Sequence, residues 1–76
     1  MHTRMIKLGS TIRQRRNVLG LRQSSLADLT GVSTRTIQLV EQGKGNPSLE
    51  TLLNLMDSLG LQLELTLKDP AKLDDV

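Results

Sequence analysis

The spacing of the apolar residues changes once along this chain, and the change separates a helical part from a strand-like part. In four segments the apolar side chains recur every three or four positions, which is the period of an amphipathic helix. These segments are residues 7–19, 23–30, 34–42 and 49–59, and the first leaves room for an earlier start. From residue 61 to residue 68 the apolar side chains instead alternate strictly with polar ones. This alternation is typical of a half-buried β-strand.

The stripe of the first predicted helix contains one charged side chain among apolar ones. Its members at helical spacing are Leu8, Ile12, Arg16 and Leu19. A buried arginine needs a carboxylate partner, because an unpaired charge is costly away from water. Glu41 is expected on the inner side of the third helix. We therefore predict that Arg16 and Glu41 form an ion pair that fastens the first helix to the third.

The second and third predicted helices flank the short sequence Gly31-Val32-Ser33. Gly31 can end the earlier helix because glycine adopts a left-handed conformation at low cost, and Ser33 is a suitable N-cap for the later one. Two helices joined by such a turn form a helix-turn-helix, which presents its second helix to the major groove of DNA. At about 100° per residue, that helix has an inner face (Ile37, Val40, Glu41) and an outer face (Arg35, Gln38, Leu39, Gln42).

The fourth predicted helix follows a loop at residues 43–47 that is rich in helix-breaking residues. Ser48 is a suitable N-cap at its start, and Gly60 is expected to end it. Its predicted core face consists of five apolar side chains: Leu49, Leu52, Leu53, Met56 and Leu59.

The alternating segment 61–68 finds no second strand-like segment in the chain to pair with. A lone strand would leave its backbone hydrogen-bonding groups unpaired. The simplest partner is the same strand of a second copy, antiparallel about a twofold axis. The apolar side chains of the paired strands would then cover the cores of the two copies: Leu61, Leu63, Leu65 and Leu67. The alternatives are an extension of the fourth helix or a loose tail, and Gly60 and the strict alternation argue against both.

Composition removes several classes of function. The 76 residues include no cysteine and no aromatic residue. This excludes disulfides and thiolate metal sites, and it argues against binding of single strands by base stacking. No apolar run reaches the roughly 18 residues of a membrane span, and the N-terminus lacks the apolar region of a signal peptide. We expect a cytoplasmic protein without cofactor or metal, and no enzyme, since no nucleophile and base share a plausible site.

Length and charge suggest one small domain with two electrostatically different halves. The domain is predicted at residues 1–68, with the dimerisation strand at 61–68, followed by a disordered acidic tail at 69–76. Residues 1–44 carry eight basic and two acidic side chains, a net charge of +6, whereas residues 45–76 carry two basic and six acidic, a net charge of −4. The basic half is either a phosphate-binding surface or an ordinary solvated one.

The order of motifs between residues 8 and 60 resembles the Cro/CI (XRE) family of DNA-binding domains. The matching residues are 19–27, 31–33, Ile37, 41–44, 46–49, Thr51 and Leu52. The resemblance implies a mainly α fold, a lambda-repressor-like helix-turn-helix domain of four to five helices. Residues 59–65, Leu-Gly-Leu-Gln-Leu-Glu-Leu, are similar to the HipB-type antitoxin branch. That second similarity implies one C-terminal β-strand that pairs across a homodimer.

The resemblance also implies roles for individual residues. Positions that reach base edges in the family are matched here by Ser33, Thr34, Arg35, Gln38 and Leu39. Positions that contact DNA phosphates are matched by Gln23, Thr36, Gln42, Lys44 and Asn46. Arg22 stands where the family usually has a capping Thr, Ser or Asn, and its charge could add a phosphate contact. Arg16 and Glu41 match an ion pair of the family, in agreement with the pairing argued above.

Together these observations predict a sequence-specific transcriptional repressor that binds double-stranded DNA as a homodimer on a palindromic operator. The HipB-like segment favours the antitoxin and autorepressor of a HipBA-like toxin–antitoxin operon, with a HipA-like kinase toxin as a partner and the bacterial nucleoid as its location. The tail has no aromatic residue, which argues against toxin contact through the tail. The alternatives are a stand-alone XRE-type regulator and a protein-interaction adapter that has kept the fold.

Overall fold

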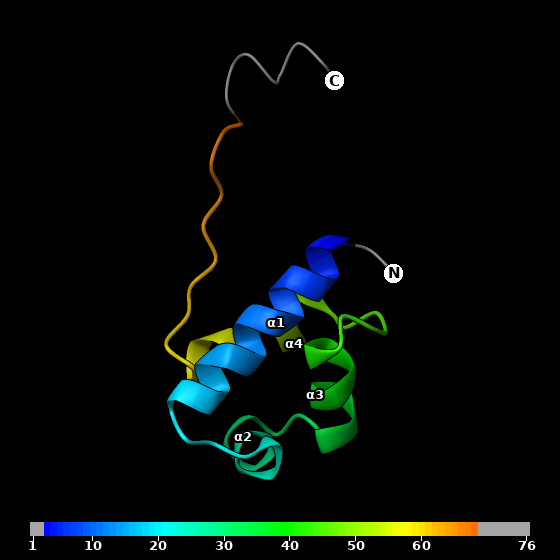
Figure 1. Cartoon of the computed structure of the whole chain (residues 1–76), viewed down its shortest axis with the longest axis vertical. Helices are drawn as coiled ribbons and strands as arrows, with labels where there is room; N and C mark the ends of the chain where they lie inside the picture. Colours follow the sequence, from blue (N-terminus) through cyan, green and yellow to red (C-terminus); the bar gives the residue numbers. More distant parts are fainter. Residues whose placement is uncertain (1–2, 69–76) are drawn as a thin grey trace.

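Four helices make up the regular structure of residues 3–68, which are the residues that this computed structural model describes (Figure 1). They are α1 (Thr3–Val18), α2 (Gln23–Thr30), α3 (Thr34–Glu41) and α4 (Leu49–Ser58). Helix α3 packs against α1 and α2, and α2 also packs against α4. The predicted mainly helical fold is confirmed, although α1 begins about one turn before residue 7. None of these helices is long and apolar enough to cross a membrane.

The ends of the helices show why the chain turns where it does. Ser33 caps α3 by accepting a hydrogen bond from the Thr36 N–H at 3.1 Å. Gly31 follows α2 in the left-handed conformation, with φ of 74°, and its N–H donates to the Ala27 carbonyl at 2.9 Å. Since the turn between α2 and α3 is only three residues long, glycine and the serine cap together fix the angle at which α3 leaves it.

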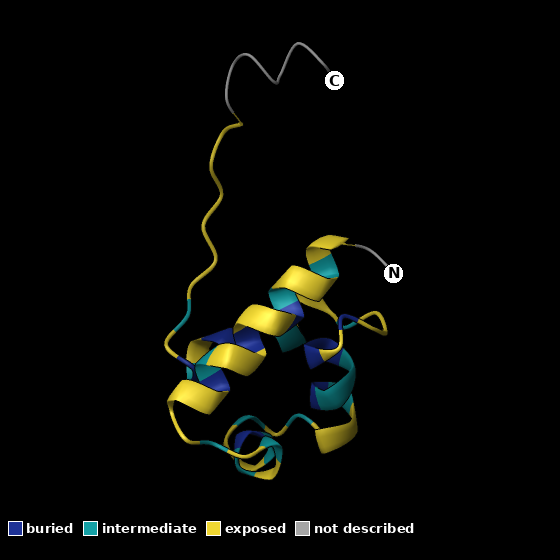
Figure 2. Cartoon of the chain, viewed as in Figure 1, coloured by how far each residue is buried: buried dark blue, intermediate teal, exposed yellow. Residues whose placement is uncertain are grey.

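Figure 2 shows most of the segment after α4 as exposed. The core lies where the four helices meet. Its buried apolar side chains are Ile12, Leu26, Ile37, Val40, Leu55, Met56 and Leu59. Side chains that pack against it from the edge are Leu8, Leu21, Ala27, Val32, Leu52 and Leu61. The inward residues of α3 are thus those that the helical period predicts.

The core face of α4 differs in part from its prediction. Leu55 is fully buried, whereas Leu49 is 61% and Leu53 41% exposed. Leu53 turns about 100° away from Leu52, so it leaves the stripe that faces the other helices. Leu49, four positions before Leu53, lies on the same exposed side of α4, in its first turn. Leu19, expected in the stripe of α1, is 44% exposed because α1 has already ended at Val18.

Helices α1 and α3 approach closely at a glycine. Gly9 is buried in α1, and a Cβ atom placed there would overlap the carbonyl oxygen of Val40 near the end of α3. A side chain at this position would push the two helices apart. The absence of one lets the backbone of α1 lie directly against the C-terminal turn of α3.

The segment that follows α4 is not a strand in the single chain that is described. Leu61 packs on the core, but residues 61–68 carry no regular structure and run away from the helices (Figure 1). Leu63, Leu65 and Leu67 are 51%, 92% and 94% exposed. The predicted strand pairing needs a second copy, and the predicted tail at 69–76 lies outside the described residues.

Candidate nucleic-acid interface

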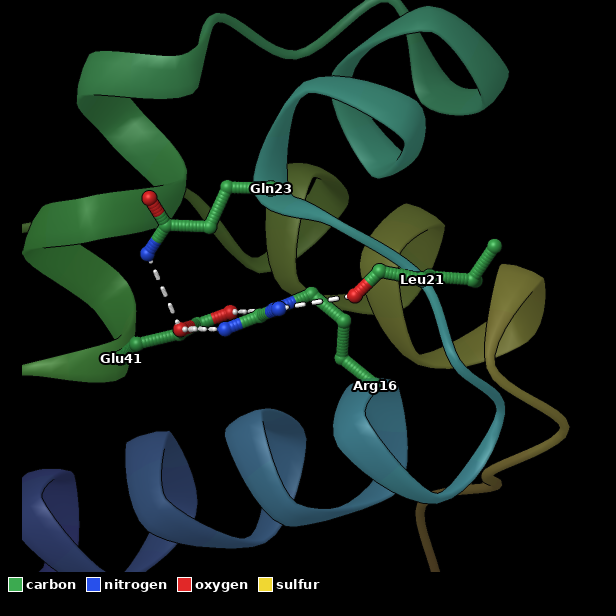
Figure 3. Close-up of polar contacts among 4 residues, drawn as sticks. All are labelled: Arg16, Leu21, Gln23 and Glu41. Atoms are coloured by element: carbon green, nitrogen blue, oxygen red, sulfur yellow. Dashed lines mark hydrogen bonds and ion pairs between the residues drawn. The ribbon is translucent and has the colours of Figure 1, made fainter.

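A buried network behind α3 connects three helices (Figure 3). Arg16 donates two hydrogen bonds to the Glu41 carboxylate, from Nε to Oε2 at 2.6 Å and from Nη2 to Oε1 at 2.9 Å. Its Nη1 donates a third to the Leu21 carbonyl at 2.8 Å. Gln23, the first residue of α2, donates from Nε2 to Glu41 Oε1 at 3.1 Å. The predicted Arg16–Glu41 ion pair is therefore present, and it also holds the start of α2.

The network keeps both of its charged groups ionised. The hydrogen bond to Glu41 raises the pKa of Arg16 above its ordinary value, although burial opposes this. Burial alone would raise the pKa of Glu41, but hydrogen bonds from Arg16 and Gln23 and the charges of Arg16 and Arg13 leave that pKa below its ordinary value. Within residues 3–68, no buried side-chain nitrogen or oxygen lacks a hydrogen-bond partner. A bidentate arginine–carboxylate pair of this kind fixes orientation as well as distance.

The outward residues of α3 are accessible to different degrees. Thr34 and Arg35 are exposed at its start, while Gln38 and Leu39 are half-buried further along. Leu39 lines a shallow hollow of about 200 Å³ together with Val40 and the loop that follows α3. The Ser33 hydroxyl accepts the Thr36 N–H and donates to Thr36 Oγ1 at 3.0 Å, so capping uses its donor and one of its two acceptor lone pairs.

The residues matched to phosphate contacts fall into two groups. Arg22 and Gln23 lie at the start of α2, where Arg22 provides no side-chain cap. The other group lies on α3 and in the loop after it: Thr36, Gln42, Lys44 and Asn46. Arg22, Gln42, Lys44 and Asn46 are exposed, and Gln23 and Thr36 are half-buried. The first group thus borders the buried network, and the second lies along α3 and just after its C-terminal end.

Two arginines of α1 have positions that the sequence pattern did not assign. Arg15 donates from Nε to the carbonyl of Leu59 at 2.8 Å, which ties α1 to the end of α4. Arg13 lines a polar pocket of about 220 Å³ with Gln23, Gln38, Glu41 and Gln42. Arg13 precedes Arg16 by three positions, so helical spacing places it beside the predicted ion pair. That spacing was the signal that could have found it.

The arrangement offers hydrogen-bond donors and positive charge rather than reactive groups. Within residues 3–68 no three His, Cys, Asp or Glu side chains lie together as metal ligands would. The described polar side chains around α3 are guanidinium, amide, hydroxyl and ammonium groups, together with one carboxylate that is already neutralised by Arg16. Such donors recognise phosphate oxygens and base edges.

A family profile described as Helix-turn-helix matches residues 12–65 of the chain. This chain belongs to the Cro/CI (XRE) family of helix-turn-helix proteins. The family consists of DNA-binding transcription regulators and not of enzymes, so the expectation of a non-enzymatic DNA-binding domain is confirmed at this level. The matched residues include α2, α3 and α4, and the profile extends past Gly60 into the alternating segment.

Two of the proteins that are similar to this chain in sequence are longer HTH-type transcriptional regulators. An uncharacterized HTH-type transcriptional regulator of Haemophilus influenzae is 44% identical over 50 residues, which cover 66% of this chain and 51% of that protein. The HTH-type transcriptional regulator PuuR of Escherichia coli is 33% identical over 67 residues, 88% of this chain and 36% of that protein. The chain thus spans about half or less of the length of these curated relatives.

The structural comparison finds a neighbour of similar size. The crystal structure of the restriction-modification controller protein C.AhdI from Aeromonas hydrophila superposes with a TM-score of 0.74 and 33% sequence identity. The match covers 80% of this chain and 92% of that one. The matching part of this chain therefore corresponds to nearly the whole of that controller protein.

Proposed function

We propose that this chain is a homodimeric transcriptional repressor that reads a palindromic operator in duplex DNA with α3, at the nucleoid in the bacterial cytoplasm. The observation that carries the proposal is the buried Arg16–Glu41 pair, with hydrogen bonds of 2.6 and 2.9 Å. This pair holds the inner side of α3 while Arg35 remains exposed on its other side. A recognition helix needs such rigid support, because side chains that read bases must be held in place.

The base-reading side chains follow from their chemistry. Arg35 can donate two hydrogen bonds to guanine O6 and N7, and Gln38 can bond adenine in a similar fork. Leu39 can contact a thymine methyl group, as apolar side chains do in the major groove. Ser33 and Thr34 add short contacts at the start of the helix. Each well-placed bidentate pair contributes about 1–3 kcal/mol of discrimination against the wrong base.

The phosphate-binding side chains position the helix without reading sequence. Gln23 uses its Nε2 once, toward Glu41 at 3.1 Å, and its amide has a second N–H for a phosphate oxygen. Arg22 adds a positive charge beside it. From the other end of the recognition helix we assign the contacts of Thr36, Gln42, Lys44 and Asn46. Such contacts supply most of the affinity and make it fall steeply with salt.

The dimer is proposed to form through the alternating segment 61–68. Leu65 and Leu67 are 92% and 94% exposed in the single chain, and an exposed, unpaired apolar segment is a template for pairing with another chain. Antiparallel pairing with a second copy satisfies the backbone groups and places Leu61, Leu63, Leu65 and Leu67 against both helical bodies. The proposed domain then comprises residues 1–68, with its dimerisation strand at 61–68.

Two biological settings fit such a dimer. The alternating residues 59–65 support the antitoxin and autorepressor of a HipBA-like operon, whose partner would be a HipA-like kinase toxin. The likeness to the controller protein C.AhdI, which the match covers to 92%, supports instead a stand-alone regulator of restriction-modification genes. The identity of the adjacent gene discriminates them. A kinase-like product that co-purifies with this chain supports the antitoxin, and neighbouring restriction and modification genes support the controller.

The repressor proposal is tested by comparing specific with non-specific DNA binding. An operator is first selected from random duplexes, and gel-shift titrations then compare it with a scrambled duplex. Arg35→Ala is expected to weaken operator binding by about 5- to 150-fold, the equivalent of 1–3 kcal/mol, with a smaller loss on the scrambled duplex. Equal losses on both duplexes would contradict base reading by Arg35. Native protein that shows no salt-dependent binding to either duplex would support the adapter alternative.

A further inference from the structure

The polar pocket between α1, α2 and α3 contains an arginine that acts on Glu41 through its charge but forms no hydrogen bond or ion pair among residues 3–68. The pocket measures about 220 Å³ and is lined by Arg13, Gln23, Gln38, Glu41 and Gln42. Its one carboxylate, Glu41, already accepts two hydrogen bonds from Arg16 and one from Gln23. Arg13 is exposed and makes none of the hydrogen bonds or ion pairs found among residues 3–68. The guanidinium of Arg13 therefore faces the pocket with its donors unused.

The remaining donors of the pocket have the chemistry of an anion site. Since Arg16 neutralises Glu41, Arg13 leaves the pocket with a net positive charge. Gln38 on α3 and Gln42, which directly follows α3, contribute amide groups one turn apart. Gln23 retains a second N–H. The pocket of about 220 Å³ is open to solvent, so an anion can reach these donors from outside. Arginine suits this role because its planar fork can bind two phosphate oxygens at once.

The position of the pocket indicates which anion it receives. Gln38 belongs to the base-reading side of α3, and Gln42 and Gln23 belong to the two groups of side chains assigned to phosphates. A duplex that lies along α3 brings its sugar-phosphate backbone past the rim of the groove, next to these three glutamines. A phosphodiester of that same duplex is therefore the anion nearest to Arg13 when α3 is seated.

We propose that Arg13, from α1, binds a backbone phosphate of duplex DNA in this pocket. The proposal rests on the function proposed above and adds to it a contact from a helix outside the helix-turn-helix. One phosphate in the pocket would then contact three elements at once: α1, the start of α2 and the outer side of α3. Seating of α3 in the groove is thereby coupled to the position of α1.

A salt titration with a matched control tests the contact. Arg13→Ala is expected to weaken binding to the selected operator and to a scrambled duplex by similar factors, and to lower the slope of log K against log salt by about 0.9. Arg4→Ala removes the same charge from α1 but lies nine positions away, on the opposite face at 100° per residue. This control is expected to keep the native slope. Equal slopes for Arg13→Ala and native protein would overturn the proposal.

Two further measurements separate contact from structural support. Arg13→Lys keeps the charge without the fork, so it is expected to restore the slope with only part of the affinity. Duplexes with single neutral methylphosphonate linkages are expected to include one position at which native protein and Arg13→Ala bind equally. If Arg13→Ala fails to fold, the lysine variant is used in that scan. The absence of any such position would overturn the proposal.

The remaining outcomes distinguish this pocket from the general proposal. Arginine Nε–H resonances of the full chain, assigned by loss in Arg13→Ala, are expected to shift with duplex DNA and not with inorganic phosphate alone. A shift with inorganic phosphate alone would assign the pocket to a free anion and overturn the DNA contact. Operator binding that depends on Arg35 but not on Arg13 would overturn the pocket only. Absence of duplex binding by native protein would overturn both proposals.

Discussion

The buried network behind α3 and the exposed segment 61–68 differ in where their side chains find interaction partners. In the network, Arg16 and Glu41 would each be costly to bury alone, and each finds its partner within the same chain at 2.6 Å. In the segment, Leu65 and Leu67 are 92% and 94% exposed, and the partners that we propose for them lie in a second copy. The network is completed by folding alone, whereas the proposed pairing of the segment would depend on protein concentration through the second copy.

Breaking the internal network is expected to have the largest effect. Arg16→Ala leaves Glu41 as a buried carboxylate without its bidentate partner, which typically costs about 3–5 kcal/mol. Small domains have about 5–15 kcal/mol of stability in total, so this variant should be largely unfolded on mild heating. Thermal unfolding followed by circular dichroism measures the loss.

The matched control for this prediction replaces both charges at once. Arg16→Met combined with Glu41→Leu removes the desolvation cost together with the pair, and such double replacements are often close to neutral. The double variant should therefore be more stable than Arg16→Ala. A single variant that unfolds within a few degrees of native protein would show that the pair is not what holds α1 to α3.

Breaking the segment is expected to have a smaller effect, confined to assembly. Leu65→Pro removes one backbone donor and one leucine from the proposed ladder. A hydrogen bond contributes about 0.5–1.5 kcal/mol and burial of a leucine about 1.5–3 kcal/mol, so each copy loses about 2–4.5 kcal/mol. Because both copies of the dimer carry the change, the dissociation constant should rise by about three orders of magnitude or more. Sedimentation velocity over a range of concentrations measures this change. The helical signal in circular dichroism should be preserved, because Leu65 contacts no helix in the single chain.

Leu65→Val is the control for the segment, since valine keeps the backbone donor, the apolar character and the strand preference. It should sediment as native protein does. A Leu65→Pro variant that remains a tight dimer would place the dimer contact elsewhere on the helical body. The exposed leucines of the segment would then not be what joins the two copies.

The same distinction explains which features could be predicted from the sequence. The helices, the cap at Ser33 and the Arg16–Glu41 pair depend on spacing and on partners within one chain, and all of them could be predicted. The core face of α4 was predicted only in part, because its stripe of closely spaced leucines fits more than one helical face. Leu55 is buried and Leu53 is 41% exposed, and this choice depends on the angle at which α4 meets α2.

The interface was harder to predict than the core, for a physical reason. An exposed side chain such as Arg13 lies outside the apolar stripe, so its spacing of three positions from Arg16 is the signal in the sequence that indicates its position. Its place beside Gln23 and Gln38 becomes visible only when three helices are brought together. The roles of Arg35 and Gln38 came from a family resemblance and not from spacing alone. Those roles therefore stay predictions until DNA binding is measured.

The smallest expected effect separates folding from recognition within the helix-turn-helix. Ser33 and Ser48 cap α3 and α4 in nearly the same way, accepting an N–H at 3.1 and 3.0 Å and donating to a threonine hydroxyl at 3.0 and 2.9 Å. Each serine-to-alanine change should therefore cost about 1 kcal/mol of stability, or roughly 4–8 °C in Tm for a domain of this size. Differential scanning calorimetry measures both variants. Since the caps match, operator affinity measured well below Tm should fall for Ser33→Ala and not for Ser48→Ala, and equal affinities would mean that Ser33 acts only as a cap.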